Sequence, residues 1–155
     1  EPDNRRAREA MMLAATQGGI AFSNASVTLI HGMSRPVGAL FHVPHGLSNA
    51  MLLPEVTAWS VSGAAARYAA AARCMGMAAG GGGDELACDR LVAGLRQLCA
   101  DLSVPSPAAF GIAAADWFNS LQTMAQQALA SGSPGNNPRV PAAGEIVALY
   151  QRVWR

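Results

Sequence analysis

Two histidines, His31 and His45, have the side-chain type and the spacing to bind one metal ion. They lie 14 positions apart (45 − 31), and a glycine follows each of them. A neutral imidazole can donate one nitrogen lone pair to Fe²⁺ or Zn²⁺ while an acceptor holds its other ring N–H. The spacing leaves a second interpretation open, because a lone histidine on an apolar helix is often a hydrogen-bonded core residue.

The residues between the two histidines predict that they lie on separate helices. Pro36 and Pro44 rule out one continuous helix, because each proline removes an N–H donor and collides with the preceding turn. The pattern predicts a helix that carries His31 near its end, a tight apolar crossing, and a second helix that begins at His45. Two rigid elements would then direct both imidazoles at one point, as a metal site requires. His42, within the crossing, is predicted to be a loop histidine.

Apolar residues at helical spacing predict helices along the whole chain. No alternating run of β-branched residues predicts a strand. The four glycines at 80–83 are expected to connect two helices, since a phosphate loop would need a preceding strand and a fixed glycine spacing. Pro54 is expected to kink its helix rather than end it. The fold expected is therefore a single all-α domain, a multi-helix orthogonal bundle. The helices are predicted at residues 4–21, 24–33, 45–59, 62–75, 84–102, 114–130 and 145–154.

Composition and charge narrow the classes of function. The formal net charge is +1, and the arginines at 5, 6 and 8 lie among acidic residues, which indicates a solvated helix face and no nucleic-acid interface. No apolar stretch reaches membrane-spanning length, so no membrane partner is expected. The three cysteines form no C-x-x-C pair, which indicates buried thiols in a reducing compartment and predicts a cytoplasmic protein. With 51% apolar and 14% charged residues, the chain is either a compact alanine-rich protein or a domain whose apolar face is normally covered.

The segment around the two histidines resembles the histidine-bearing signature of the iron-containing alcohol dehydrogenases, the group III family related to glycerol dehydrogenase and dehydroquinate synthase. The resemblance continues to the end of the chain. The matching residues of the signature are Gly19, Ala21, Phe22, Ser23, Asn24, His31, Gly32, Pro36, Gly38, Ala39, Pro44, His45, Gly46, Asn49, Ala50, Leu52, Leu53 and Pro54. Those of the tail are Asn137, Pro138, Arg139, Glu145, Ile146, Val147, Tyr150 and Trp154.

This resemblance implies the carboxy-terminal half of an NAD(P)-dependent alcohol dehydrogenase, which transfers hydride between an alcohol or aldehyde and nicotinamide. Family members hold one divalent metal, usually iron and sometimes zinc, between an amino-terminal dinucleotide-binding domain and a helical carboxy-terminal domain. One aspartate and three histidines bind the metal, and His31 and His45 match the last two histidines. The Asp-x-x-x-His pair that supplies the other ligands does not occur here.

The chain is therefore expected to be a fragment: residues 1–155 form one α-helical metal-binding domain that lacks the dinucleotide-binding domain. That domain is its expected partner, together with a small alcohol or aldehyde substrate, and the resemblance leaves room for a homo-oligomer. Two imidazoles alone are expected to hold iron weakly, so the fragment is expected to be inactive by itself.

Arg35 departs from the family pattern, since many relatives carry a histidine there, near the nicotinamide. Arginine stays protonated near neutral pH and cannot act as a general base, but it can hold a carboxylate, a phosphate or an acidic substrate. We expect Arg35 to be a cofactor-binding residue, with a surface arginine at a helix end as the alternative. Phe22 resembles a position beside the family's substrate pocket, and residues 137–139 a loop near the cleft mouth. Both could instead be structural.

Two other functions remain open on the sequence. One is a non-catalytic helical module that binds a partner through an exposed apolar surface. The other is a zinc-dependent polyol dehydrogenase of the same superfamily. Metal affinity, and the metal that restores activity, would separate these from an iron-dependent alcohol dehydrogenase.

Overall fold

The structure, a computed structural model, describes residues 2–155, and over these residues it is helical without any strand. The all-α expectation is therefore confirmed. None of the helices over these residues is long and apolar enough to cross a membrane. The α-helices are α1 (Arg5–Ala25), α2 (Leu29–Phe41), α3 (His45–Ser60), α4 (Ala65–Cys74), α5 (Asp84–Asp101), α6 (Pro107–Phe110), α7 (Ala114–Ala130) and α8 (Ala143–Val153). Two 3₁₀-helices, η1 (Val61–Gly63) and η2 (Ser133–Asn136), follow α3 and α7.

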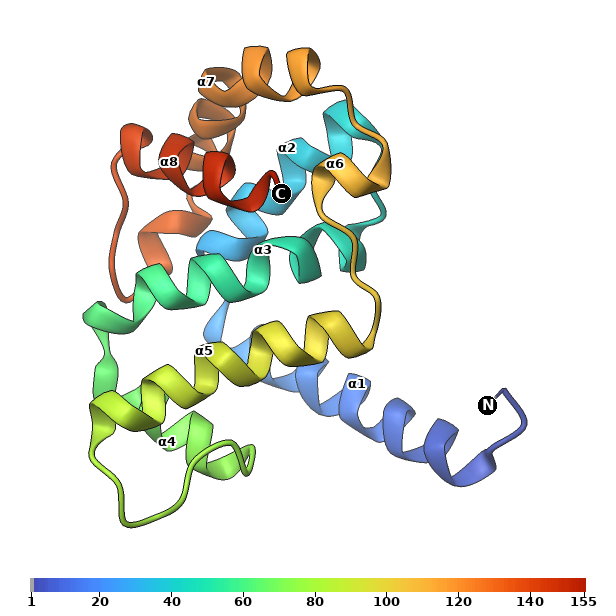
Figure 1. The fold of residues 1–155 in the computed structure, drawn as a ribbon, viewed down its shortest axis with the longest axis vertical. Helices are drawn as coiled ribbons and strands as arrows, with labels where there is room; N and C mark the ends of the chain where they lie inside the picture. The colour runs from blue at the N-terminus through green and yellow to red at the C-terminus, as the bar shows by residue number, and fades with distance from the viewer. Residues whose placement is uncertain (1) are drawn as a thin grey trace.

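The main core lies where α2, α3, α7 and α8 pack on one another, in the upper part of Figure 1. Trp117 and Tyr150 are fully buried at its centre, with their rings edge to face. The Trp117 indole N–H donates to the Tyr150 carbonyl at 3.3 Å, and the Tyr150 hydroxyl donates to the Met33 carbonyl at 2.7 Å. These bonds satisfy the polar tips of both aromatic residues, which would otherwise be costly to bury.

A second, smaller core joins α4 to α5, below the main core in Figure 1. It is built mainly from small side chains, with Leu91 and Leu95 as its largest buried members. The glycine-rich segment at 80–83 connects the two helices, as the sequence predicts. Arg73 closes this connection by donating to the Gly82 carbonyl at 2.8 Å and to the Asp84 carboxylate at 2.9 Å.

Helix α1 extends away from the other helices toward the N-terminus (Figure 1). None of its residues is buried, although it carries several large apolar side chains. Met12 is 72% exposed, and Met11, Leu13 and Ile20 are each at least 60% exposed. Exposed large apolar side chains in this number on one helix are often covered by another part of a protein.

The predicted boundary of the helix that carries His31 is wrong. The chain breaks at residues 26–28, where Ser26 has a φ of 64°, and α2 then runs through Pro36 to Phe41. A proline inside a helix costs about 3 kcal/mol or more in isolation. Here α2 crosses the main core and buries Leu29, Met33 and Val37, and this burial offsets the loss. His31 therefore lies in the first turn of α2, not near its end.

Other predicted boundaries agree with the structure to within four residues or differ by one short element. Helix α3 begins at His45 and continues through Pro54, as predicted. His42 lies between α2 and α3 in the left-handed region, with a φ of 55°, and its side chain is exposed, which confirms it as a loop residue. The segment expected to be only a linker after residue 104 contains the short helix α6, which the Ser106 hydroxyl caps.

Candidate metal centre

The structure brings His31 and His45 together from the starts of two adjacent helices. His31 lies in the first turn of α2, and His45 is the first residue of α3. Their ring centroids are 5.3 Å apart, with an angle of 52° between the ring planes. Pro44 precedes α3 with an extended backbone, and the neighbouring Val43 is 3% exposed in the main core. This anchored turn reverses the chain and sets His45 against His31.

The separation of the two rings fits a shared metal ion. With a metal–nitrogen distance of about 2.1 Å and a tetrahedral angle, two imidazoles on one ion have centroids about 5.2 Å apart. The observed 5.3 Å agrees with that value. No group of three or more His, Cys, Asp or Glu side chains suited to a metal occurs among residues 2–155. Since catalytic sites use at least three protein ligands, these two histidines can form only part of such a centre.

The surroundings of His31 favour its neutral form. Burial lowers the pKa of His31 below its ordinary value of 6.5, and the nearby His45 and Arg35 lower it further. A neutral imidazole has a free lone pair, which is the form that a metal requires. His45 is more exposed than His31.

Asn49 is a neighbour of the pair for which the sequence predicted no role. It lies one turn after His45 on α3, and its amide nitrogen donates to the His45 carbonyl at 2.8 Å. The same nitrogen is 3.2 Å from Nε2 of the His45 ring. Its Oδ1 atom is buried and has no hydrogen-bond partner among residues 2–155. The spacing of four residues from a candidate ligand is the signal that would have identified it.

A hollow of ≈ 480 Å³ opens beside His31, between the end of α1 and the starts of α2 and α3. Apolar side chains form most of its wall, including Phe22, Ile30 and Leu53, while His31 and Asn49 supply polar groups. An apolar cleft with a few convergent polar groups is typical of a small-molecule site. Phe22 is 55% exposed and lines this hollow, so it has no structural role in the core of this chain.

Arg35 lies one turn after His31 on α2. Its Nη1 atom donates to the Ser133 hydroxyl at 3.2 Å, and the side chain is otherwise exposed. It takes part in none of the three ion pairs found among residues 2–155. It lines a second hollow, of ≈ 540 Å³, together with the end of α1.

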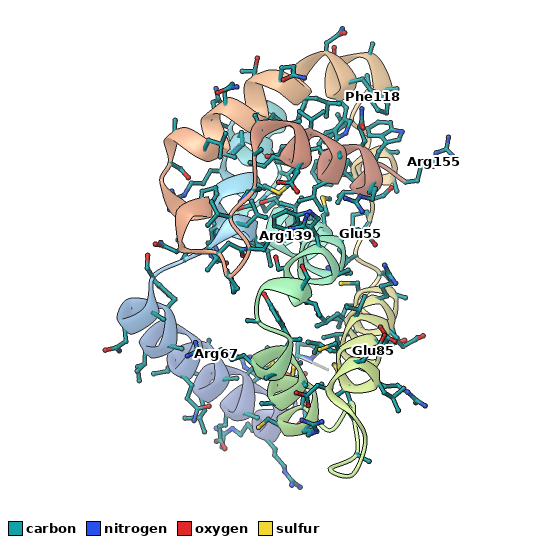
Figure 2. All side chains as sticks on the ribbon, turned by 90° about the vertical axis from the view of Figure 1, so that its left-hand side faces the viewer. Glu55, Arg67, Glu85, Phe118, Arg139 and Arg155 are labelled. Carbon is teal, nitrogen blue, oxygen red and sulfur yellow. The ribbon has the colours of Figure 1, made fainter. Side chains whose placement is uncertain are left out.

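The loop at residues 137–139 has a structural role in this chain. The buried Asn137 donates from its side chain to the Ser60 hydroxyl at 3.0 Å. Arg139 stacks on Trp59, 4.0 Å from the ring centroid, and pairs with Glu145 at 2.7 Å. Figure 2 shows Arg139 near the middle of the molecule, above the α4–α5 pair. These contacts hold the loop against the end of α3.

Comparison with known proteins identifies the family of the chain. A family model described as "Fe-containing alcohol dehydrogenase family, C-terminal" matches residues 1–154. The lactaldehyde reductase of Escherichia coli (strain K12) is 34% identical over 152 residues, which cover 97% of this chain and 39% of that protein. The 1,3-propanediol dehydrogenase of Klebsiella pneumoniae is 32% identical, and the match covers 97% of this chain and 38% of that protein.

Solved structures show the same helical arrangement. A 1,3-propanediol oxidoreductase superimposes with a TM-score of 0.90 at 30% identity, covering 97% of this chain and 39% of that chain. An alcohol dehydrogenase from Oenococcus oeni gives a TM-score of 0.91 at 29% identity, covering 99% of this chain and 39% of that chain. The chain thus spans about two fifths of the length of these relatives. The match of the family model over nearly every residue shows that this chain belongs to the iron-containing alcohol dehydrogenase family, in its carboxy-terminal part.

Proposed function

We propose that this chain is the metal-binding part of an iron-containing, NAD(P)-dependent alcohol dehydrogenase, with His31 and His45 as two of the metal ligands. The observation that carries the proposal is the pair of imidazoles 5.3 Å apart on the first turns of α2 and α3. Residues 1–155 would act as one helical domain. An amino-terminal part outside these residues would supply the remaining metal ligands and most of the dinucleotide site. The relatives support this proposal, because they are much longer than this chain.

The donor set suits the metal. Imidazole nitrogen binds both Fe²⁺ and Zn²⁺, and the family name favours iron. When bound, the metal would supply Lewis-acid polarisation of the C–O bond during hydride transfer to or from nicotinamide. Asn49 holds the His45 backbone and lies against its ring, which limits the rotation of that imidazole.

The hollow beside His31 would bind the carbon chain of a small alcohol or aldehyde. Its walls at Phe22, Ile30 and Leu53 offer apolar contact, which would displace water from around the carbon chain. Arg35 lies on the same helix one turn beyond His31 and would hold an anionic group in the cleft, the cofactor's phosphate among the candidates.

Metal titration tests this proposal. The chain would be studied alone and joined to the preceding part of the E. coli lactaldehyde reductase, by anaerobic calorimetry with Fe²⁺ and with Zn²⁺. Since two ligands bind weakly, we expect tight one-to-one binding only in the fusion. His31→Ala and His45→Ala should each weaken that binding at least tenfold. His42→Ala, a histidine in the loop between α2 and α3, is the matched control and should keep it. Binding that is unaffected by all three substitutions would refute the ligand assignment.

The exposed apolar side chains of α1 favour a second candidate, a non-catalytic helical module that binds another protein. The same titration separates the two functions, because such a module needs no metal at His31 and His45. All three cysteines are free, but only Cys88 is buried and Cys74 is exposed, so the expectation of three buried thiols is wrong. Free thiols suit a reducing compartment, and we propose a cytoplasmic location.

A further inference from the structure

We propose that Arg35 is the anion-binding end of a groove that begins at the His31–His45 pair, and that it selects short alcohols carrying a carboxylate at the end opposite the hydroxyl. This inference rests on the proposed function of the pair as metal ligands. An anionic group in the groove could come from the substrate or from a phosphate of the dinucleotide. We assign the anionic group to the substrate, and the experiment below distinguishes the two sources.

The first observation is the position of Arg35 on α2. Arg35 follows His31 by four residues, and side chains at this spacing lie on the same face of a helix, with Cβ atoms about 6 Å apart. A short molecule with its reacting carbon at the histidine pair can therefore reach the guanidinium.

The second observation is that the charge of Arg35 is not neutralised within residues 2–155. Three other arginines, Arg73, Arg96 and Arg139, each pair with a carboxylate at 2.9 Å or less. The hydrogen bond of Arg35 goes instead to a neutral hydroxyl, that of Ser133. A guanidinium has five N–H donors in a fixed fork, so one bond to Ser133 leaves donors for a carboxylate.

The third observation is that Ser133 provides a rigid anchor. Ser133 is 5% exposed at the start of η2, and its neighbour Pro134 packs against α2. The contact is so close that a Cβ atom on Gly32 would lie 2.9 Å from the Pro134 ring. The bond to Ser133 therefore orients the guanidinium before any ligand arrives, which reduces the entropy lost on binding.

The fourth observation is that the two hollows share part of their lining. The hollow beside His31 and the hollow beside Arg35 share Phe22, Ser26 and Val27. A molecule can thus lie along this shared wall with its carbon chain against Phe22 and Val27. Its alcohol end would meet the histidine pair, and its charged end would meet Arg35. A short ω-hydroxycarboxylate, or the matching aldehyde acid, has this pattern of groups.

Kinetics of the fusion with the lactaldehyde reductase part, loaded with iron, provide the test. The ratio of kcat/KM for 4-hydroxybutyrate to that for 1-butanol measures the selectivity for a carboxylate. Arg35→Gln should lower this ratio at least tenfold, since a charge-assisted bond is lost. Arg35→Lys should restore part of it. Arg67→Gln, which alters an exposed arginine on α4, is the matched control and should leave the ratio as it is.

Each of the other possible results has a different meaning for the proposal. If Arg35→Gln raises the KM of the dinucleotide equally with both alcohols and leaves the ratio constant, Arg35 binds the cofactor phosphate and the substrate assignment is overturned. If neither quantity changes, Arg35 is not an anion site. If the fusion oxidises no alcohol, the proposed function fails. An NMR titration of the 155-residue chain with butyrate and with 1-butanol then decides the inference by itself. Shifts at the Arg35 side chain with butyrate alone would support it, and their absence would overturn it.

Discussion

Replacing Gly63 with alanine should destabilise the fold through a single added methyl group. Gly63 ends η1, and the chain at residues 138–139 passes directly over it. A Cβ atom at position 63 would lie 2.6 Å from three backbone atoms, the carbonyl carbon and oxygen of Pro138 and the nitrogen of Arg139. Ordinary van der Waals contact begins at 3.4 Å, so the passing segment must move by most of an ångström.

The cost of that movement can be worked out from the contacts that hold the segment. Overpacking of this kind costs about 1–3 kcal/mol. The movement would also stretch the 3.0 Å bond between Asn137 and Ser60, a buried bond that contributes about 1 kcal/mol. The stacking of Arg139 on Trp59 lies in the same segment. We therefore expect Gly63→Ala to lower the free energy of unfolding by about 2–4 kcal/mol.

Urea unfolding followed by circular dichroism measures this difference, with the slope of the transition compared between variants. Gly144→Ala is the matched control, because a Cβ atom there meets nothing within 4 Å and the residue lies in helix α8. The control should leave stability unchanged or raise it by up to about 1 kcal/mol, since alanine favours a helix. A Gly63→Ala protein within about 0.5 kcal/mol of the original would refute the close packing of this loop on η1.

Two further predictions concern the core and its pH dependence. Tyr150→Phe removes the bond to the Met33 carbonyl and should lower the free energy of unfolding by about 1 kcal/mol in urea; an unchanged midpoint would contradict this. The pKa of Glu145 is lowered below 4.5, first by the Ala142 backbone N–H and also by Arg139. A depressed carboxylate pKa contributes stability that is present above the unfolded value and is lost as the pH falls through the folded one. Glu145→Gln should therefore destabilise the protein at pH 7 and cease to do so in acid, in urea unfolding at both pH values. If the two proteins still differed in stability in acid, the charge of Glu145 would not be the cause of its stabilising effect.

The placement of the two histidines on separate helices could be predicted from local features of the sequence. Proline and glycine act on their own backbone, so the break before His45 and the start of α3 follow from the residues at 42–46 without knowledge of the fold. The helical class follows in the same way from apolar spacing. The ends of the helix that carries His31 could not be predicted from local sequence. Its continuation through Pro36 depends on the burial of α2 among α3, α7 and α8, which local propensity does not include.

The residue types, their order and the helical periodicity are present in the chain itself, and they were enough to point to two imidazoles on separate helices. The 5.3 Å between those rings, the 98 residues of sequence that separate Arg35 from its partner Ser133, and the passage of the 138–139 backbone over Gly63 arise only when distant segments pack together. Such contacts depend on the shape of the whole core, and no window of sequence contains both partners. For this reason the two histidines could be found from the sequence alone, while the hollows that His31 and Arg35 line required the folded structure.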